Sequence, residues 1–135
     1  MRTLFLLLFT MVAITSFGQD VVLAQNTSSE PFNLFREASQ SLDEGRPRQA
    51  VLKFEKIIEY YQHSGRQSEL AQNYFGMALA FAFSKNYRQS IRYHKKALRA
   101  HNRYTSSEPA QEILINLGLT YQLAGRKNKA KKYLS

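Results

Sequence analysis

The sequence repeats itself with a period of 40 residues, and no other feature constrains the fold as strongly. Three six-residue segments align at that offset: residues 45–50 (GRPRQA), 85–90 (KNYRQS) and 125–130 (GRKNKA). The alignment extends upstream and downstream of these segments. A fixed period of this kind predicts structural units that stack on one another, each burying its apolar face against the next.

Each unit is predicted to contain two helices joined by a tight turn. In the first half of unit two, apolar residues recur at steps of three and four, as on one face of a helix: Tyr74, Met77, Ala78 and Phe81. The second half repeats this spacing at Ile91, His94, Ala97 and Leu98. Small residues, which let helices approach closely, form two columns: Ala38, Ala78 and Gly118, then Ala50, Ser90 and Ala130. We therefore expect an all-α fold.

The clearest motif lies in unit three. Residues 117–121 (LGLTY), followed by Gly125 and Ala130, resemble the tetratricopeptide repeat, a helix-turn-helix with a Leu-Gly-x-x-Tyr core, a turn Gly and a small Ala. Unit two departs from this motif at three positions, which hold Phe81, Lys85 and Ser90. The resemblance implies a tetratricopeptide-type helix-turn-helix solenoid.

The resemblance covers residues 32–135 and divides them into repeats at about 31–66, 67–106 and 107–135. The usual tetratricopeptide period is 34 residues, so about six residues are added between units, around 62–67 and 102–107, as longer helices or loops. Ser135 lies about two turns into the second helix of unit three. We therefore expect a truncated third repeat that can self-associate through its uncapped end.

The N-terminus has the layout of a secretory signal peptide. Arg2 precedes an apolar run at residues 4–14, and small residues follow. The run is shorter than the roughly 20 residues that span a bilayer. We predict cleavage after Gly18, or alternatively after Ala24, with a polar linker at residues 19–31. The chain is therefore expected to be periplasmic or secreted, and an uncleaved membrane anchor is the alternative.

In tetratricopeptide proteins the first helices of the repeats line a concave groove that takes an extended peptide or a partner helix. The resemblance therefore implies a mostly apolar groove built by Phe35, Phe75, Leu79, Phe83, Ile115, Asn116 and Leu119, with Ser39 and Gln122 beside them. Relatives that bind a C-terminal carboxylate use basic and Asn side chains here, and only Arg36 and Asn116 are of that kind. The alternative is that Phe75, Leu79, Ile115 and Leu119 are core residues.

Positive charge is concentrated in the second half of the chain. Residues 66–135 hold 13 bases and three acids, a net charge of +10, in a protein whose total is +9. The second helix of unit two carries six of the bases between its apolar columns, and these predict a basic convex face: Arg88, Arg92, Lys95, Lys96, Arg99 and Arg103. This face is either simply solvated or binds an acidic protein or an anionic envelope surface. Export and the absence of a recognition motif argue against nucleic acid as a partner.

Several chemistries are excluded by composition. The chain has no cysteine, so it has neither disulfides nor thiolate chemistry. His94 shares a column with Phe54 and Leu134, which indicates a packed imidazole rather than a base, and no metal-ligand spacing or phosphate-binding loop is present. We expect no enzyme activity, cofactor or metal. The predicted function is an exported scaffold for protein or peptide partners; the alternative is the extracytoplasmic sensory region of a longer bacterial signalling protein, such as a sensor histidine kinase.

Overall fold

The computed structural model describes residues 29–104 and 110–135, which are helical and contain no strand. The elements follow the chain in this order: α2 (Ser29–Asp43), α3 (Pro47–His63), the short 3-10 helix η1 (Gln67–Glu69), α4 (Leu70–Phe83), α5 (Tyr87–Tyr104), α6 (Gln111–Leu123) and α7 (Lys127–Leu134). The predicted signal peptide at residues 1–18 lies outside the described residues. Most of the predicted linker does too, but its last residues, 29–31, form the first turn of α2.

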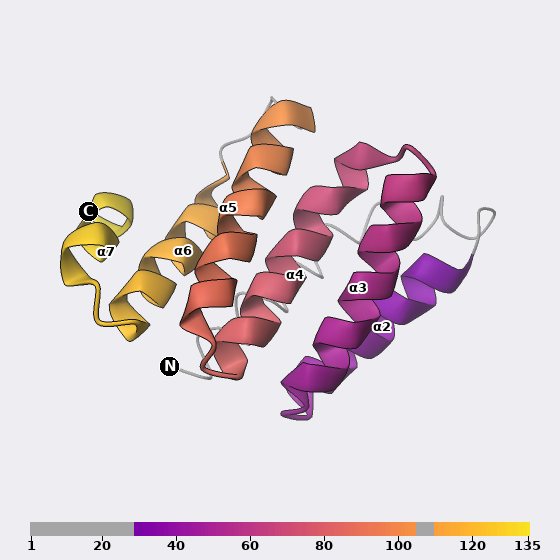
Figure 1. Cartoon of the computed structure of the whole chain (residues 1–135), viewed down its shortest axis with the longest axis horizontal. Coiled ribbons are helices and arrows are strands. Elements are labelled where there is room, and N and C mark those ends of the chain that lie inside the picture. The colour runs from indigo at the N-terminus through magenta and orange to yellow at the C-terminus, as the bar shows by residue number, and fades with distance from the viewer. Residues whose placement is uncertain (1–28, 105–109) are drawn as a thin grey trace.

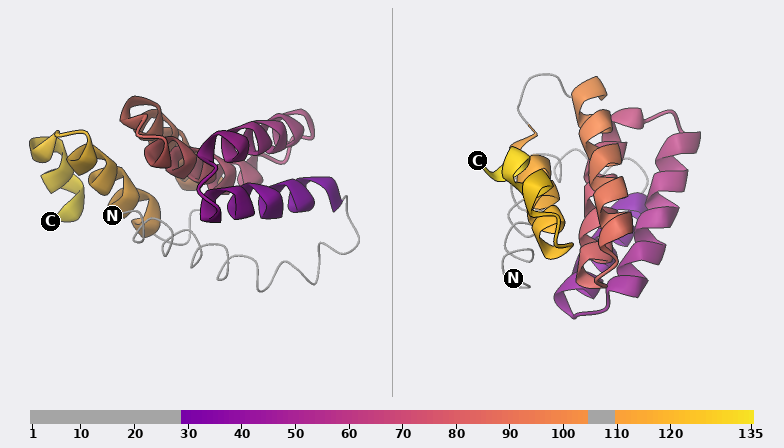
Figure 2. Two further views of the ribbon diagram at one scale, coloured as in Figure 1. Left: turned by 90° about the horizontal axis from the view of Figure 1, so that it is seen from below. Right: turned by 60° about the vertical axis from the view of Figure 1, so that its left-hand side comes forward.

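The helices form three hairpins that stack in sequence. α2 packs on α3, α4 on α5 and α6 on α7, while α3 also contacts α4 and α5 contacts α6. Figure 1 shows α4 between α3 and α5, and the views in Figure 2 show the hairpins following one another from α2–α3 to α6–α7. The predicted all-α solenoid is therefore confirmed. Within the described ranges, no helix is both long and apolar enough to cross a membrane.

The same turn closes each hairpin. Gly45, Lys85 and Gly125 have φ angles of 72°, 60° and 76°, in the left-handed region. The amide after each of them donates to a carbonyl five residues earlier, as in Arg46 to Ser41 at 2.7 Å. This is the Schellman arrangement, which satisfies the carbonyls left free at the end of a helix. Pro47 then opens α3 with a φ that suits a first turn.

Small residues stand where helices cross, as predicted. Ala38, Ala78, Ala50 and Ser90 are completely buried. Ser90 also ties its hairpin together, because its hydroxyl donates a 2.8 Å hydrogen bond to the carbonyl of Ala78.

A glycine makes the contact between hairpins one and two unusually close. A Cβ atom at Gly76 of α4 would lie 2.4 Å from Cζ of Phe54 in α3, whose side chain is completely buried. The bare backbone of α4 therefore rests on the Phe54 ring. Such an approach excludes any larger side chain at Gly76 unless the ring moves.

The residues added by the 40-residue period lengthen one helix and build another element. α3 has 17 residues and ends at His63, and a turn at Ser64 and Gly65 leads into η1. The residues added around 62–67 therefore extend α3 and form a turn, in line with the predicted longer helices or loops. α5 has 18 residues. Of the residues added around 102–107, residues 102–104 belong to α5 and the others lie outside the described residues.

Lys85 is the only described residue other than glycine with a positive φ. A left-handed conformation costs an L-residue roughly 1–2 kcal/mol, and glycine adopts it without that cost. Because glycine also gains entropy in the unfolded chain, we expect Lys85→Gly to raise the free energy of unfolding by up to about 1 kcal/mol. Urea denaturation measures this, and Gly45→Lys, the reverse change in hairpin one, should destabilise the protein. A lower free energy of unfolding for Lys85→Gly would contradict the left-handed conformation assigned to residue 85.

Candidate interaction surfaces

Four residues predicted to line the groove are core residues instead. Phe35, Phe75, Leu79 and Asn116 are buried. The Phe35 ring packs edge-on against Phe54 at 5.8 Å between centroids. The Phe75 ring lies 5.7 Å from that of His94 on α5, and Leu79 belongs to the same apolar cluster as Phe35. The groove prediction is wrong for these four residues, because their side chains pack within the helix assembly rather than facing solvent.

The remaining groove candidates keep some accessible surface. Phe83 and Leu119 are half-buried and pack against the main core cluster, whereas Ile115 is 40% exposed. Ile115 and Leu119 lie one turn apart on α6 and therefore share a face. Of the polar neighbours, Ser39 is half-buried and Gln122 is exposed.

Ile115 corresponds by the 40-residue offset to Phe35 and Phe75, and Leu134 corresponds to Phe54 and His94. In repeats one and two the residues at these two positions are buried, as Phe35 with Phe54 and as Phe75 with His94. In repeat three, Ile115 and Leu134 are 40% and 41% exposed. Leu134 lies close over α6, since a Cβ atom at Gly118 would be 2.8 Å from its Cδ2. Ile115, Leu119 and Leu134 form what we call the apolar patch.

The predicted basic face lies along α5. Its arginines and Lys95 are exposed and Lys96 is half-buried, and the helix itself contains no acidic residue. Within the described residues, the ion pairs join Arg46 to Glu44, Lys53 to Glu37 and Arg66 to Glu69, all before α4. The cations of α5 therefore have no carboxylate partner in this part of the chain.

Lys96 is held in an unusual environment for an ammonium group. Its Nζ lies 4.8 Å from the ring centroid of Tyr93 and 5.6 Å from that of Tyr74, which are cation–π distances. Burial lowers the pKa of Lys96, and the positive charges of Arg92 and Arg99 lower it further. A negative charge nearby would therefore stabilise the charged form of Lys96.

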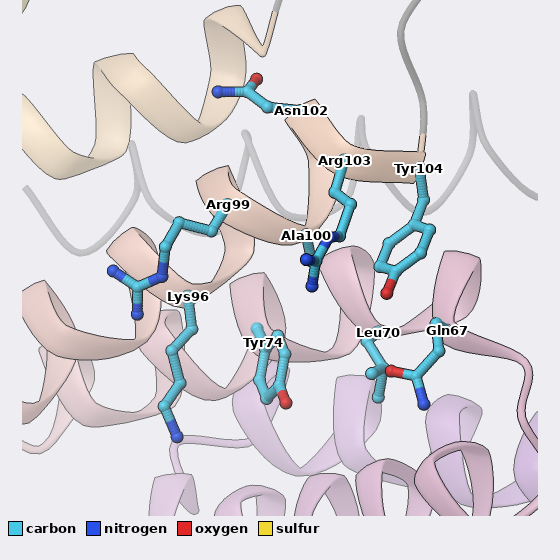
Figure 3. Close-up of a pocket in the computed structure, with 9 residues that line it drawn as sticks. All are labelled: Gln67, Leu70, Tyr74, Lys96, Arg99, Ala100, Asn102, Arg103 and Tyr104. Atoms are coloured by element: carbon cyan, nitrogen blue, oxygen red, sulfur yellow. The ribbon is translucent and has the colours of Figure 1, made fainter.

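A pocket of about 690 Å³ opens beside Lys96, between α5, η1 and the start of α4. Figure 3 shows Lys96 and Arg99 on one side of Tyr74, Leu70 and Gln67 on its other side, and Arg103 between Tyr74 and Tyr104. Arg103 lies 6.0 Å from the ring centroid of Tyr104. The sequence identified the cations but missed Gln67 and Leu70, because the positions of these two residues depend on how the added residues before α4 fold.

Comparison with known proteins rests on structure. No family model matches the sequence, and no curated protein matches it. A crystal structure of the tetratricopeptide repeat domain of Arabidopsis FLU is similar to the chain with a TM-score of 0.72 at 21% sequence identity, covering 77% of this chain and 87% of the FLU chain. The chain has a tetratricopeptide repeat fold.

In the tetratricopeptide register, α2, α4 and α6 are the first helices of the repeats and α3, α5 and α7 the second. The apolar patch therefore spans both helices of repeat three. The pocket beside Lys96 lies mainly on the second helix of repeat two. No group of three metal-ligating side chains occurs in the described part of this tetratricopeptide array.

His94 occupies the tetratricopeptide position that holds Phe54 in repeat one, and Asn116 occupies that of Gly76. His94 is completely buried. Among the residues that the structure describes, neither ring nitrogen of His94 nor the side-chain oxygen of Asn116 has a hydrogen-bond partner. Burial lowers the pKa of His94 to about 3. The imidazole is thus neutral and structural, as the sequence predicted.

His94 should make folding sensitive to acid. Its pKa is about 3 in the folded state and about 6.5 in an unfolded chain. Between these values only the unfolded state binds the proton, so stability falls by about 1.4 kcal/mol for each pH unit below 6.5. We expect His94→Leu, which installs the residue type of repeat three, to remove this part of the slope in urea denaturation at pH 7 and pH 5. The control is His63→Leu at an exposed site. If His94→Leu shows the same pH dependence of the free energy of unfolding as this control, the role assigned to His94 is wrong.

Proposed function

We propose that this chain is an exported interaction scaffold that binds an amphipathic helix of a partner protein at the apolar patch. One observation carries the proposal: Ile115 and Leu134 are 40% and 41% exposed at positions that are buried in the two preceding repeats. The tetratricopeptide fold supports a protein partner in general, because its activity lies in surfaces rather than in a catalytic centre.

The preceding repeats indicate how such a helix would dock. In the first interface α4 covers the Phe35–Phe54 pair by laying Gly76 over the Phe54 ring. A partner helix with a small residue at its crossing point would cover Ile115 and Leu134 in the same way. Completing the burial of these two partly exposed aliphatic side chains is worth about 0.6–1.2 kcal/mol for each.

Charge favours a partner with acidic flanks over a second copy of this chain. α7 carries four exposed lysines next to the patch: Lys127, Lys129, Lys131 and Lys132. Two copies meeting through this face would bring the lysines together, which is unfavourable. The expected self-association through repeat three is therefore the competing outcome of the binding experiment rather than our proposal.

Export rests on the N-terminal segment and is tested by the mature chain end. We expect Edman sequencing of the protein recovered from the secretory compartment to begin at Gln19, because small residues at Ser16 and Gly18 fit a cleavage site. A start at Gln25 would place cleavage after Ala24. Protein that retains Met1 and sediments with membranes would contradict cleavage and support an anchor.

Binding at the apolar patch can be tested with a displayed library of helical peptides panned against the purified exported chain. We expect enrichment of amphipathic helices with acidic flanks. Isothermal titration should then show at least a tenfold loss of affinity for Ile115→Glu with Leu134→Glu, because the charges prevent apolar burial.

Leu52→Glu is the matched control, since Leu52 is a 60% exposed leucine on α3, outside the patch. This variant should bind normally, and circular dichroism should show full helicity for all variants. Equal binding by the patch variant would refute the proposal. Concentration-dependent dimers of the wild type that disappear in Ile115→Glu would show that a second copy occupies the patch instead.

A further inference from the structure

The pocket beside Lys96 carries an inference of its own. Different helices build it from those of the apolar patch, so it stands even if the patch binds nothing. Lys96, Arg99 and Arg103 reach it from α5, and none of them forms an ion pair within the described residues. A concave site with several uncompensated cations favours an anionic ligand.

The walls of the pocket suit a peptide. Leu70 and Ala100 are buried beneath it and supply an apolar floor. Tyr104 is 42% exposed, and Gln67 adds an amide. In Figure 3, Tyr74 and Tyr104 stand on either side of the Arg103 guanidinium. Flat aromatic walls, an apolar floor and hydrogen-bond donors together fit a chain with its own backbone groups, rather than a free inorganic ion.

The spacing of the cations indicates the sequence of that peptide. Arg99 and Arg103 are one helical turn apart, which separates their Cβ atoms by about 5–6 Å. In an extended peptide, side chains at alternate positions lie about 6.6 Å apart and point to the same side. Carboxylates at alternate positions would therefore meet Arg99 and Arg103 together, and each arginine can bind a carboxylate with two parallel hydrogen bonds.

We propose that this pocket binds an extended acidic segment of a partner protein with Asp or Glu at alternate positions. Lys96, Arg99 and Arg103 bind the carboxylates, and the backbone of the segment runs over Leu70 and Ala100 between the two tyrosines. A bilayer surface fits less well, because Lys96 is half-buried within a depression that a flat array of headgroups does not enter.

Fluorescence anisotropy with labelled peptides tests this inference on the purified exported chain. The probe carries three Glu residues at alternate positions separated by Ser. One comparison peptide has the same composition but its Glu residues are contiguous. The other keeps the alternating positions but has Gln in place of Glu. We expect the alternating peptide to bind at least threefold more tightly than the contiguous one, and the Gln peptide not to bind.

Arg99→Glu with Arg103→Glu should reduce affinity for the alternating peptide at least tenfold. Arg48→Glu with Lys56→Glu makes the same change in net charge at exposed positions of α3, away from both the pocket and the apolar patch, and should reduce it less than threefold. Arg99→Gln with Arg103→Gln repeats the test without new acids, and circular dichroism checks that each variant is folded.

Several results would overturn the proposal. Equal losses in the α5 and α3 double variants would show attraction by net charge alone. Equal affinity for the alternating and contiguous peptides would refute the arginine spacing. Binding to vesicles containing phosphatidylserine at concentrations where no peptide binds would assign the pocket to a membrane surface. None of these readouts involves Ile115 or Leu134, so failure here and failure of the proposed scaffold function are distinguishable.

Discussion

The contact between one hairpin and the next determines most of what is distinctive in this structure. In the first interface the backbone of α4 at Gly76 rests on the buried Phe54 ring. The second interface replaces the ring with His94 and the glycine with Asn116. Within the described residues, neither the ring nitrogens of His94 nor the side-chain oxygen of Asn116 has a hydrogen-bond partner. Leu134 holds the same position in repeat three, where it is exposed. The same repeat position thus gives a close helix contact in the first interface, an acid-sensitive contact in the second, and a candidate docking surface in repeat three.

The period of 40 residues predicted the helix pairs and their turns because those features depend on local residue types. A left-handed turn favours glycine, and a helix crossing needs a small side chain, so aligned columns reveal both. Lys85 could be placed in its turn only because the alignment set it opposite Gly45 and Gly125. Its positive φ shows that the hairpin geometry overrides the preference of the residue.

The burial of Phe75 and Leu79 was harder to predict, because the register identifies the face on which a residue lies and not how far neighbouring helices cover it. One signal was available in α4 itself. Its sequence, LAQNYFGMALAFAF, is apolar around most of its circumference, and a helix of that kind is usually buried on every side. In contrast, α6 has a polar and partly exposed side, which leaves Ile115 accessible.

The distribution of charge connects the stability of the array to its surfaces. Early in the chain cations pair with carboxylates, but on α5 they pack over tyrosine rings or face solvent. A cation over a ring gains about 0.5–2 kcal/mol, which only partly offsets repulsion between neighbouring positive groups. The lowered pKa of Lys96 reflects burial and that repulsion. An acidic ligand removes the repulsion in the folded state alone, so its binding and the folding of α5 are thermodynamically linked, and each strengthens the other.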